Sequence, residues 1–189
     1  VVTYTVPSGC IATLIVTVNP VPSAITGVAG VCVGETATLS NTVSGGVWTS
    51  GSPAVATIDA TTGAYTGVAA GTAVITYTAG AGCSSTRVVT VFTSPGVITG
   101  GTAVCVGATI VVGNSVAGGT WTSSNTAVAT IGATTGIISG LTVGTTIITY
   151  RLSSGCYATT TIMVSLSPTA ITGTTSMCAG ASTTLANGV

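Results

Sequence analysis

The chain of 189 residues is 46% hydrophobic but only 2% charged, with two basic residues, two acidic residues and no histidine. This composition excludes nucleic-acid binding, which needs clustered Lys and Arg, and it excludes the Ser-His-Asp triads and common zinc sites that need histidine. Paired or clustered carboxylates and apolar runs of about 18 residues are also missing, so we expect no enzyme activity, no cofactor, no bound metal and no membrane span in this window.

A single period runs through the whole chain without an insertion or deletion. The number of residues that separates Tyr4 from Tyr77 also separates Tyr77 from Tyr150. The tryptophans Trp48 and Trp121 are separated by the same number of residues. With the recurring prolines as boundaries, the chain divides into the C-terminal part of one repeat, two complete repeats and the N-terminal part of a fourth, over residues 1–21, 22–94, 95–167 and 168–189. We therefore interpret the sequence as a window of a longer repetitive polypeptide.

The first complete repeat predicts short strands separated by turns. Threonine alternates with Val, Ile and Ala, which is typical of β-strands, and glycine marks the turns between them. The predicted strands are a first edge strand over 23–25 that continues over 28–33, followed by 36–43, 47–50, 54–58, 64–68, 72–78 and 85–91. About seven short strands without any helical period favour an all-β fold of tandem β-sandwiches, and linkers of a few residues predict that the sandwiches stack as a rod.

The recurring aromatic residues are predicted to lie in the cores of the sandwiches. In the strand over 72–78, Ile75 and Tyr77 fall on one face, and Ile148 and Tyr150 are their equivalents. We expect the tyrosine hydroxyls to be hydrogen-bonded, because a buried hydroxyl needs a partner. The tryptophans Trp48 and Trp121 have a second interpretation as exposed platforms on which sugars stack.

Several stretches resemble the bacterial immunoglobulin-like group 2 family. In the first repeat they are V-G-E-T-A-T-L at Val33–Leu39, W-T-S-G-S-P-A-V-A-T-I at Trp48–Ile58 and G-V-A-A-G-T-A-V-I-T-Y at Gly67–Tyr77; in the second, W-T-S-S-N-T-A-V-A-T-I lies at Trp121–Ile131. The resemblance covers both complete repeats. It implies immunoglobulin-like domains of the kind that build stalks of bacterial surface proteins and adhesins. The cysteines depart from the common pattern of the family and resemble a variant found in long, secreted, repeat-rich surface proteins.

Six regularly spaced cysteines without histidine predict disulfides and an extracellular or cell-surface location. One pairing, Cys32–Cys83 and Cys105–Cys156, has the spacing of the immunoglobulin inter-sheet bridge, with a tryptophan after the first cysteine of each pair. In an immunoglobulin-like sandwich, however, these positions fall at opposite poles, roughly 23 Å apart, whereas a disulfide needs Cα atoms within about 7 Å. We therefore favour an inter-repeat bond between Cys32 and Cys156, with Cys10, Cys105 and Cys178 bonded to repeats outside the window. The alternatives are the intra-repeat pairing and cysteines that remain free thiols or ligate a metal.

The four charged residues do not recur from repeat to repeat. Glu35 aligns with Ala108 and Asp59 with Gly132, so neither carboxylate can serve a function that every repeat performs. The two arginines, Arg87 and Arg151, occupy different positions of the repeat, and we expect both to be solvated.

These patterns favour a structural repeat segment of an extracellular bacterial fibre or surface stalk that disulfides stiffen. The alternative is an adhesin or a polysaccharide-binding repeat array. Expected partners are neighbouring repeats and other copies of the chain in a fibre, because a surface with so little charge and no lysine at its sheet edges does not oppose association. Threonine is abundant and no Asn-x-Ser/Thr sequon occurs, so any glycan would be O-linked.

Overall fold

The computed structural model describes residues 1–19 and 21–188. Pro20 and Val189, which fall in the predicted partial repeats, lie outside the described residues. The chain divides into two compact units, Val1–Thr93 and Ser94–Val189, and this division lies one residue before the predicted boundary between the complete repeats. The prediction of an all-β fold with tandem sandwiches is confirmed.

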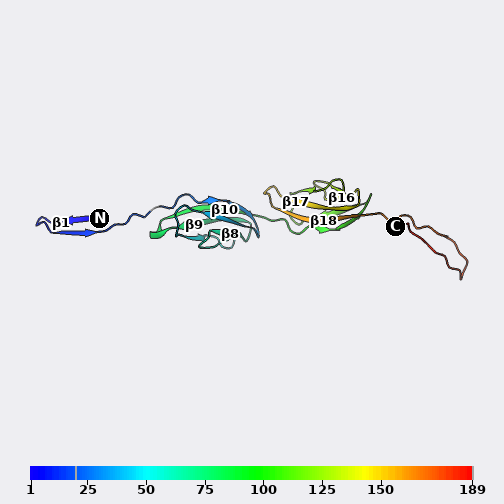
Figure 1. Ribbon diagram of the computed structural model, residues 1–189, viewed down its shortest axis with the longest axis horizontal. Coiled ribbons are helices and arrows are strands. Elements are labelled where there is room, and N and C mark those ends of the chain that lie inside the picture. The colour runs from blue at the N-terminus through cyan, green and yellow to red at the C-terminus, as the bar shows by residue number, and fades with distance from the viewer. Residues whose placement is uncertain (20, 189) are drawn as a thin grey trace. The chain divides into compact units, whose positions relative to one another are not determined.

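The first unit contains a sandwich of two four-stranded sheets (Figure 1). One sheet has the order β4, β10, β9, β6, formed by Gly30–Cys32, Ser84–Phe92, Gly71–Thr78 and Val47–Ser50. The other has the order β3, β5, β8, β7, formed by Thr26–Gly27, Thr36–Ser40, Ala64–Gly67 and Ala56–Ile58. A short 3-10 helix, η1 (Gly80–Gly82), lies in the hairpin between β9 and β10.

The second unit repeats this topology strand for strand. Its first sheet has the order β12, β18, β17, β14, formed by Ala103–Cys105, Tyr157–Ser165, Gly144–Arg151 and Thr120–Ser123. Its second sheet has the order β11, β13, β16, β15, formed by Thr99–Gly100, Thr109–Gly113, Ile137–Gly140 and Ala129–Ile131. The register of the sequence repeat is therefore also the register of the strands.

Each described sandwich has eight strands rather than about seven, because the first predicted strand is divided between the two sheets. In the first unit β3 pairs antiparallel with β5, and the chain then crosses to pair β4 parallel with β10. Gly27, with φ of 115°, begins the crossing. The buried Tyr65 hydroxyl donates a hydrogen bond of 2.9 Å to the Val28 carbonyl, which supplies a partner for a backbone group that belongs to neither sheet.

The core of each sandwich comes from alternate residues of the long central strands. Along β9 the side chains of Ala73, Ile75 and Tyr77 point inward and those between them point outward, as the pleat of a strand requires. In the second unit Ile148 and Tyr150 of β17 take the same positions. All four aromatic and isoleucine side chains are at most 5% exposed.

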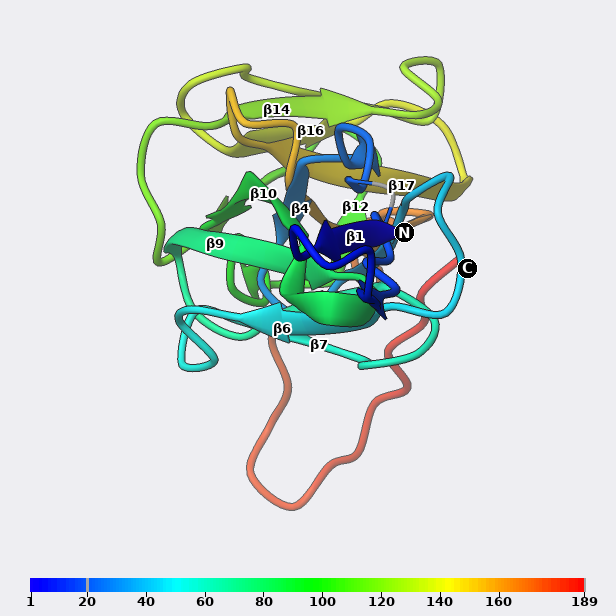
Figure 2. The ribbon, with the colours of Figure 1, turned by 90° about the vertical axis from the view of Figure 1, so that its left-hand side faces the viewer.

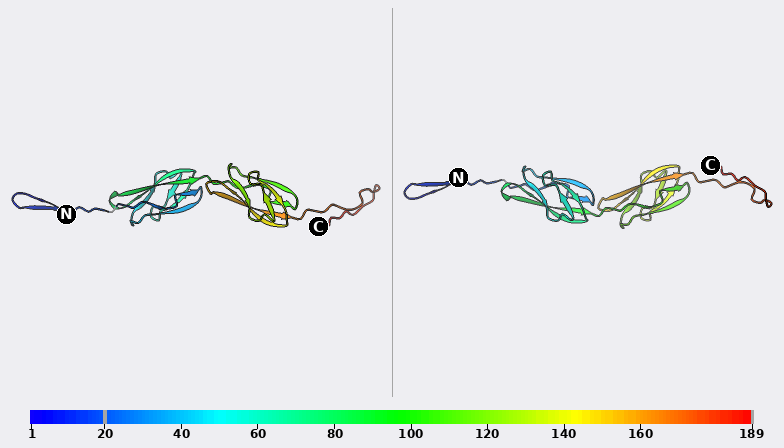
Figure 3. Two further views of the ribbon diagram at one scale, coloured as in Figure 1. Left: turned by 90° about the horizontal axis from the view of Figure 1, so that it is seen from above. Right: turned by 90° about the horizontal axis from the view of Figure 1, so that it is seen from below.

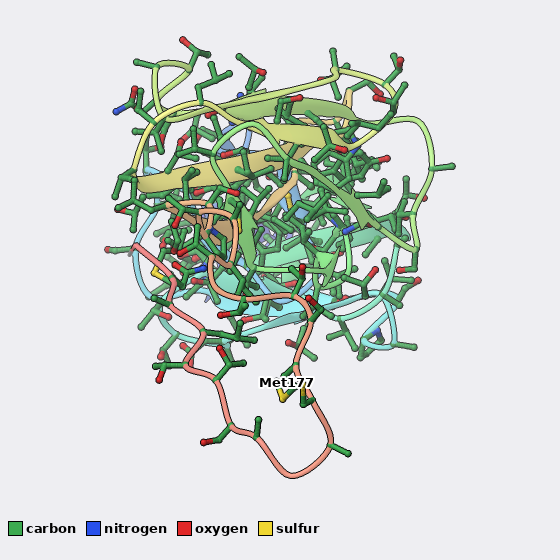
Figure 4. All side chains as sticks on the ribbon, turned by 90° about the vertical axis from the view of Figure 1, so that its right-hand side faces the viewer. Met177 is labelled. Atoms are coloured by element: carbon green, nitrogen blue, oxygen red, sulfur yellow. The ribbon has the colours of Figure 1, made fainter. Side chains whose placement is uncertain are left out.

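Among residues 1–19 and 168–188, the strand pairing of the two partial repeats is local. The hairpin of β1 (Val2–Thr5) and β2 (Ile11–Leu14) lies near the N-terminus (Figure 2). The C-terminal segment (Figure 3) has one isolated bridge between Thr172 and Ala186. Residues at core positions are exposed here: Tyr4 is 69% exposed, and Met177, labelled in Figure 4, is 56% exposed.

Candidate functional site

A surface hollow recurs at the same place in both units. In the first unit it has a volume of about 600 Å³ and lies between the β5–β6 loop and the β7–β8 loop, with Trp48 and Tyr77 among its lining residues. In the second unit the equivalent hollow, of about 270 Å³, is lined by Trp121 and Tyr150. The hollow follows the sequence period and contains aromatic side chains in both units.

The tyrosine at the base of this hollow fixes the loop above it. The Tyr77 hydroxyl donates to the Val43 carbonyl at 2.6 Å and accepts from the Gly46 backbone N–H at 2.8 Å. A Cβ at Gly46 would collide with the Tyr77 ring, so this glycine is needed for the close approach of the loop. Tyr150 makes the same pair of bonds with Val116 and Gly119.

The tryptophans are packed against these tyrosines rather than displayed. Trp48 is 5% exposed and its ring lies 4.5 Å from that of Tyr77, centroid to centroid, at an interplanar angle of 47°. Trp121 and Tyr150 have the same separation and an angle of 43°. Gly63, with φ of 72°, approaches the Trp48 indole and the Leu39 carbonyl so closely that a Cβ would have no room. The indole faces therefore contribute to the core and are closed to a stacked sugar.

The two cysteines of each complete repeat lie at opposite ends of one strand. Cys32 is paired with Phe92, the last residue of β10, whereas Cys83 directly precedes Ser84, the first residue of that strand. A strand of nine residues spans about 30 Å, so a Cys32–Cys83 bond cannot form in this fold. Within the described residues Cys83 forms no disulfide, and the intra-repeat alternative is corrected accordingly.

The second unit gives the same result for the pair Cys105 and Cys156. Cys105 is paired with Ser165 at the end of β18, and Cys156 directly precedes Tyr157 at its beginning. Within the described residues Cys105 forms no disulfide, and neither do the exposed Cys10 and Cys178. Spacing along the sequence resembles an inter-sheet bridge, but the sheet topology separates the two sulfur atoms.

Both carboxylates stabilise turns. The Glu35 carboxylate accepts a hydrogen bond from the Cys32 backbone N–H at 3.2 Å. Asp59 Oδ1 accepts hydrogen bonds from the backbone N–H and hydroxyl groups of Thr61 and Thr62, at 2.8 to 3.0 Å. The bonds from Thr62, and then those from Thr61, hold the pKa of Asp59 well below its ordinary value, because they favour the charged form.

The expectation that both arginines are simply solvated is wrong for Arg87. Its guanidinium donates to the carbonyls of Ile25 and Gly27, and thereby ties the crossing segment to β10. Burial raises the pKa of the adjacent Tyr65 hydroxyl, while the positive charge of Arg87 acts in the opposite direction. Sequence reasoning missed this contact because its two ends lie far apart in the sequence and Arg87 does not recur.

Arg151 contacts an aromatic ring instead of the backbone. Its guanidinium carbon lies 5.5 Å from the centroid of the Tyr157 ring, which is a cation–π contact between β17 and β18. Tyr157 is 57% exposed. The sequence period did not point to this tyrosine, because Ser84 occupies the equivalent position in the other complete repeat.

Over residues 1–19 and 21–188, no group of three or more His, Cys, Asp or Glu side chains is arranged to hold a metal ion. Within the same residues no helix has the length and hydropathy needed to cross a lipid bilayer.

No protein family model and no curated protein matches this chain. Among solved structures, the chain is similar to the C-terminal 282-residue fragment of intimin, which was determined in complex with the intimin-binding domain of the translocated intimin receptor. The sequence identity is 18% and the TM-score 0.51; the match covers 79% of this chain and 65% of the intimin fragment. The chain therefore spans less than two thirds of that fragment's length.

Two further similarities are weaker in geometry. Domains 4 and 5 of the S-layer protein SbsC match at 20% identity and a TM-score of 0.35, covering 77% of this chain and 99% of that one. Cadherin domains 3–6 of protocadherin gamma B2 match at 10% identity and a TM-score of 0.35, covering 81% of this chain and 49% of that one. The intimin similarity, together with the sheet topology, defines this chain as a tandem array of immunoglobulin-like β-sandwiches.

Proposed function

We propose that the chain is a structural segment of an extracellular bacterial surface fibre or stalk, in which disulfides between neighbouring repeats stiffen a row of sandwiches. The absence of recurring charged residues and the use of the recurring aromatic residues in the core support this role. The similarity to intimin, a protein solved with its receptor domain, supports a role at a cell surface.

The observation that carries the proposal is the placement of the cysteines at opposite ends of β10 and β18. The chain leaves the first sandwich after Phe92, beside Cys32. The chain enters the sandwich at the other end, near Ser23. The Ser23 carbonyl accepts a hydrogen bond of 2.9 Å from the hydroxyl of Ser85, which lies two residues after Cys83. Cys156 is the counterpart of Cys83 in the second unit. The short linker therefore joins an end that bears Cys32 to an end that bears Cys156.

A bond between Cys32 and Cys156 would convert a single covalent connection into two. Because each complete repeat has one cysteine at each end, the same bond can be made along any number of repeats. Cys83 and Cys105 would then bond to repeats on either side of the two complete ones, and Cys10 and Cys178 to repeats further out. A row of sandwiches joined at two points resists bending at its linkers, which is a mechanical function.

Disulfide mapping tests the proposal: non-reducing digestion of the oxidised chain, followed by mass spectrometry of the linked peptides. We expect a peptide pair that contains Cys32 and Cys156. The variant Cys32→Ser should remove this pair, while Cys10→Ser, a matched change outside the complete repeats, should leave it. A linked pair of Cys32 with Cys83 would refute both the bond and the assignment of the cysteines to opposite ends.

The second candidate function is an adhesive or polysaccharide-binding array, which the recurring hollow favours. A ligand of that hollow would perturb equivalent residues in both units, for example the amides of Gly46 and Gly119. Two-dimensional NMR of the chain with oligosaccharides extracted from a bacterial surface tests this idea. Shifts at both amides would support the array, and unchanged spectra at both would leave the hollow as a structural feature of the loop.

Further copies of the chain and O-linked glycans are the proposed partners of the outer surface. The outward-facing threonines, such as Thr49, Thr76 and Thr86 in one row across β6, β9 and β10, offer hydroxyls for glycosylation. Intact-mass measurement of the native protein should show mass above that of the polypeptide, and light scattering at rising concentration should show association. A native mass equal to that of the polypeptide would refute glycosylation, and a constant monomer would refute association.

A further inference from the structure

The outer face of the β14–β17–β18 sheet carries an Arg–Tyr pair that its counterpart in the first unit lacks. The strand register places Thr120, Arg151 and Tyr157 in one row across the three strands. The next outward row contains Thr122, Thr149 and Thr159. Neighbouring strands are about 4.8 Å apart and alternate residues along a strand about 6.6 Å, so the rows lie within reach of one small ligand.

All of these side chains except Thr159 line a hollow of about 360 Å³ in the described part of the chain. It is lined by Thr120, Thr122, Thr149, Arg151 and Tyr157, all from one sheet. The Arg151 guanidinium lies over the Tyr157 ring at 5.5 Å, and more than half of the tyrosine side chain is exposed to solvent. The contact orients a cation beside an aromatic surface at the rim of the hollow.

The corresponding face of the first unit has the equivalent row of threonines, Thr49, Thr76 and Thr86, but lacks the Arg–Tyr pair. Val47 takes the position of Thr120, Thr78 that of Arg151, and Ser84 that of Tyr157. The sandwich folds without the Arg–Tyr pair, so the pair is not required by the fold. Arg151 is also the only charged side chain between residues 94 and 189, and any ionic attraction of that unit to a ligand arises from it.

We propose that this hollow binds an acidic oligosaccharide, with a hexuronate residue as its central contact. The guanidinium fork matches the geometry of a carboxylate and can donate two hydrogen bonds to it. The exposed Tyr157 ring supplies an apolar surface for the C–H face of a sugar ring. The threonine hydroxyls donate to and accept from sugar hydroxyls. The site goes beyond the structural role and does not depend on the disulfide arrangement.

The chemistry of the surroundings favours an anion over a neutral sugar. No acidic side chain occurs in the second unit to compete for the guanidinium. Arg151 is exposed, so the attraction should weaken when salt is added, because an ionic contact at the surface is screened. The hollow is shallow, and we expect a dissociation constant of order 1 mM for a trisaccharide.

The test is NMR titration of the 189-residue chain with trigalacturonic acid, with maltotriose as the neutral control. We expect amide shifts confined to β14, β17 and β18 for the acidic sugar and much smaller shifts for maltotriose. The double variant Arg151→Thr with Tyr157→Ser should bind at least about ten-fold more weakly, since hydrogen bonds to charged groups are worth about 1.5–3 kcal/mol. It gives the second unit the residues of the first, so its fold should be retained.

The reverse variant, Thr78→Arg with Ser84→Tyr, should create amide shifts in β6, β9 and β10 of the first unit. Three results would overturn the proposal: no shifts at about 10 mM sugar, well above the expected dissociation constant; equal shifts with maltotriose; or unchanged binding in a double variant whose spectrum shows an intact fold. Each outcome is independent of the disulfide map, so the site and the structural role can fail separately.

Discussion

Replacing Tyr77 with phenylalanine removes one hydroxyl and keeps the aromatic ring in place. The hydroxyl makes two hydrogen bonds, to the Val43 carbonyl and the Gly46 N–H, at 2.6 and 2.8 Å. Each is worth about 0.5–1.5 kcal/mol net, so the free energy of unfolding of the first unit should fall by about 1–3 kcal/mol. For a domain of this size, the midpoint of thermal unfolding should drop by at least about 4 °C.

Hydrogen exchange measured peptide by peptide separates the two units, since opening of the first unit exposes its own amides. Peptides from β5 and β6 should exchange faster in Tyr77→Phe, while those from β13 and β14 should be unchanged. Tyr150→Phe should produce the opposite pattern, because its hydroxyl makes the equivalent bonds. The matched control is Tyr4→Phe, the same chemical change at the same position of the repeat, where the side chain is 69% exposed.

An equally small effect of Tyr77→Phe and Tyr4→Phe would refute a stabilising role for the Tyr77 hydroxyl. That result would mean that water replaces the hydroxyl at no cost, and that the loop above the hollow is held by other contacts. Equal acceleration in both units would refute their treatment as separately stable sandwiches.

Three further predictions concern the first unit. Gly63→Ala should destabilise the first unit by more than about 2 kcal/mol in urea denaturation, because a Cβ has no room there. Gly34, with φ of 88°, has open space around it, so Gly34→Ala should cost only about 1–2 kcal/mol. Equal costs for the two variants would contradict the packing argument. The folded-state pKa of Asp59 is lowered, so its carboxylate stabilises the unit above the ordinary pKa of about 4, and this stabilisation is lost as the pH falls from there towards the folded-state pKa. Urea denaturation at about pH 5 and at about pH 2 should show the loss. The variant Asp59→Gly, which introduces the residue of the second repeat, should reduce the difference between the two pH values. Arg87→Thr, again the residue of the second repeat, should speed hydrogen exchange at residues 23–27; unchanged exchange would contradict the role of Arg87 in tying the crossing segment.

The strand pattern was predictable because each strand is a local feature. The predicted range 47–50 agrees with β6, and the predicted 72–78 and 85–91 differ from β9 and β10 by at most one residue at each end. The first strand differs more, since 28–33 contains the crossing between sheets. Its position depends on the Val28 carbonyl meeting Tyr65 and on the parallel pairing with β10, contacts between residues far apart in the sequence.

The candidate sites depended on the structure to a greater degree. The sequence period identified the aromatic residues that recur, and alternation placed them in the core, because a repeated pattern reports what every repeat needs. By the same reasoning it drew attention away from Arg87, Arg151 and Tyr157, which do not recur. Their roles follow from cross-strand contacts, which period and composition do not contain.

By itself, the sequence determined the repeat, its register, the all-β class and the core positions, since these follow from alternation and turn residues within short stretches. Only the tertiary structure decided that Cys32 and Cys83 are separated by the length of β10, and that Tyr157 lies beside Arg151. The physical reason is that pairing between strands sets these distances, and the same local pattern is compatible with more than one pairing.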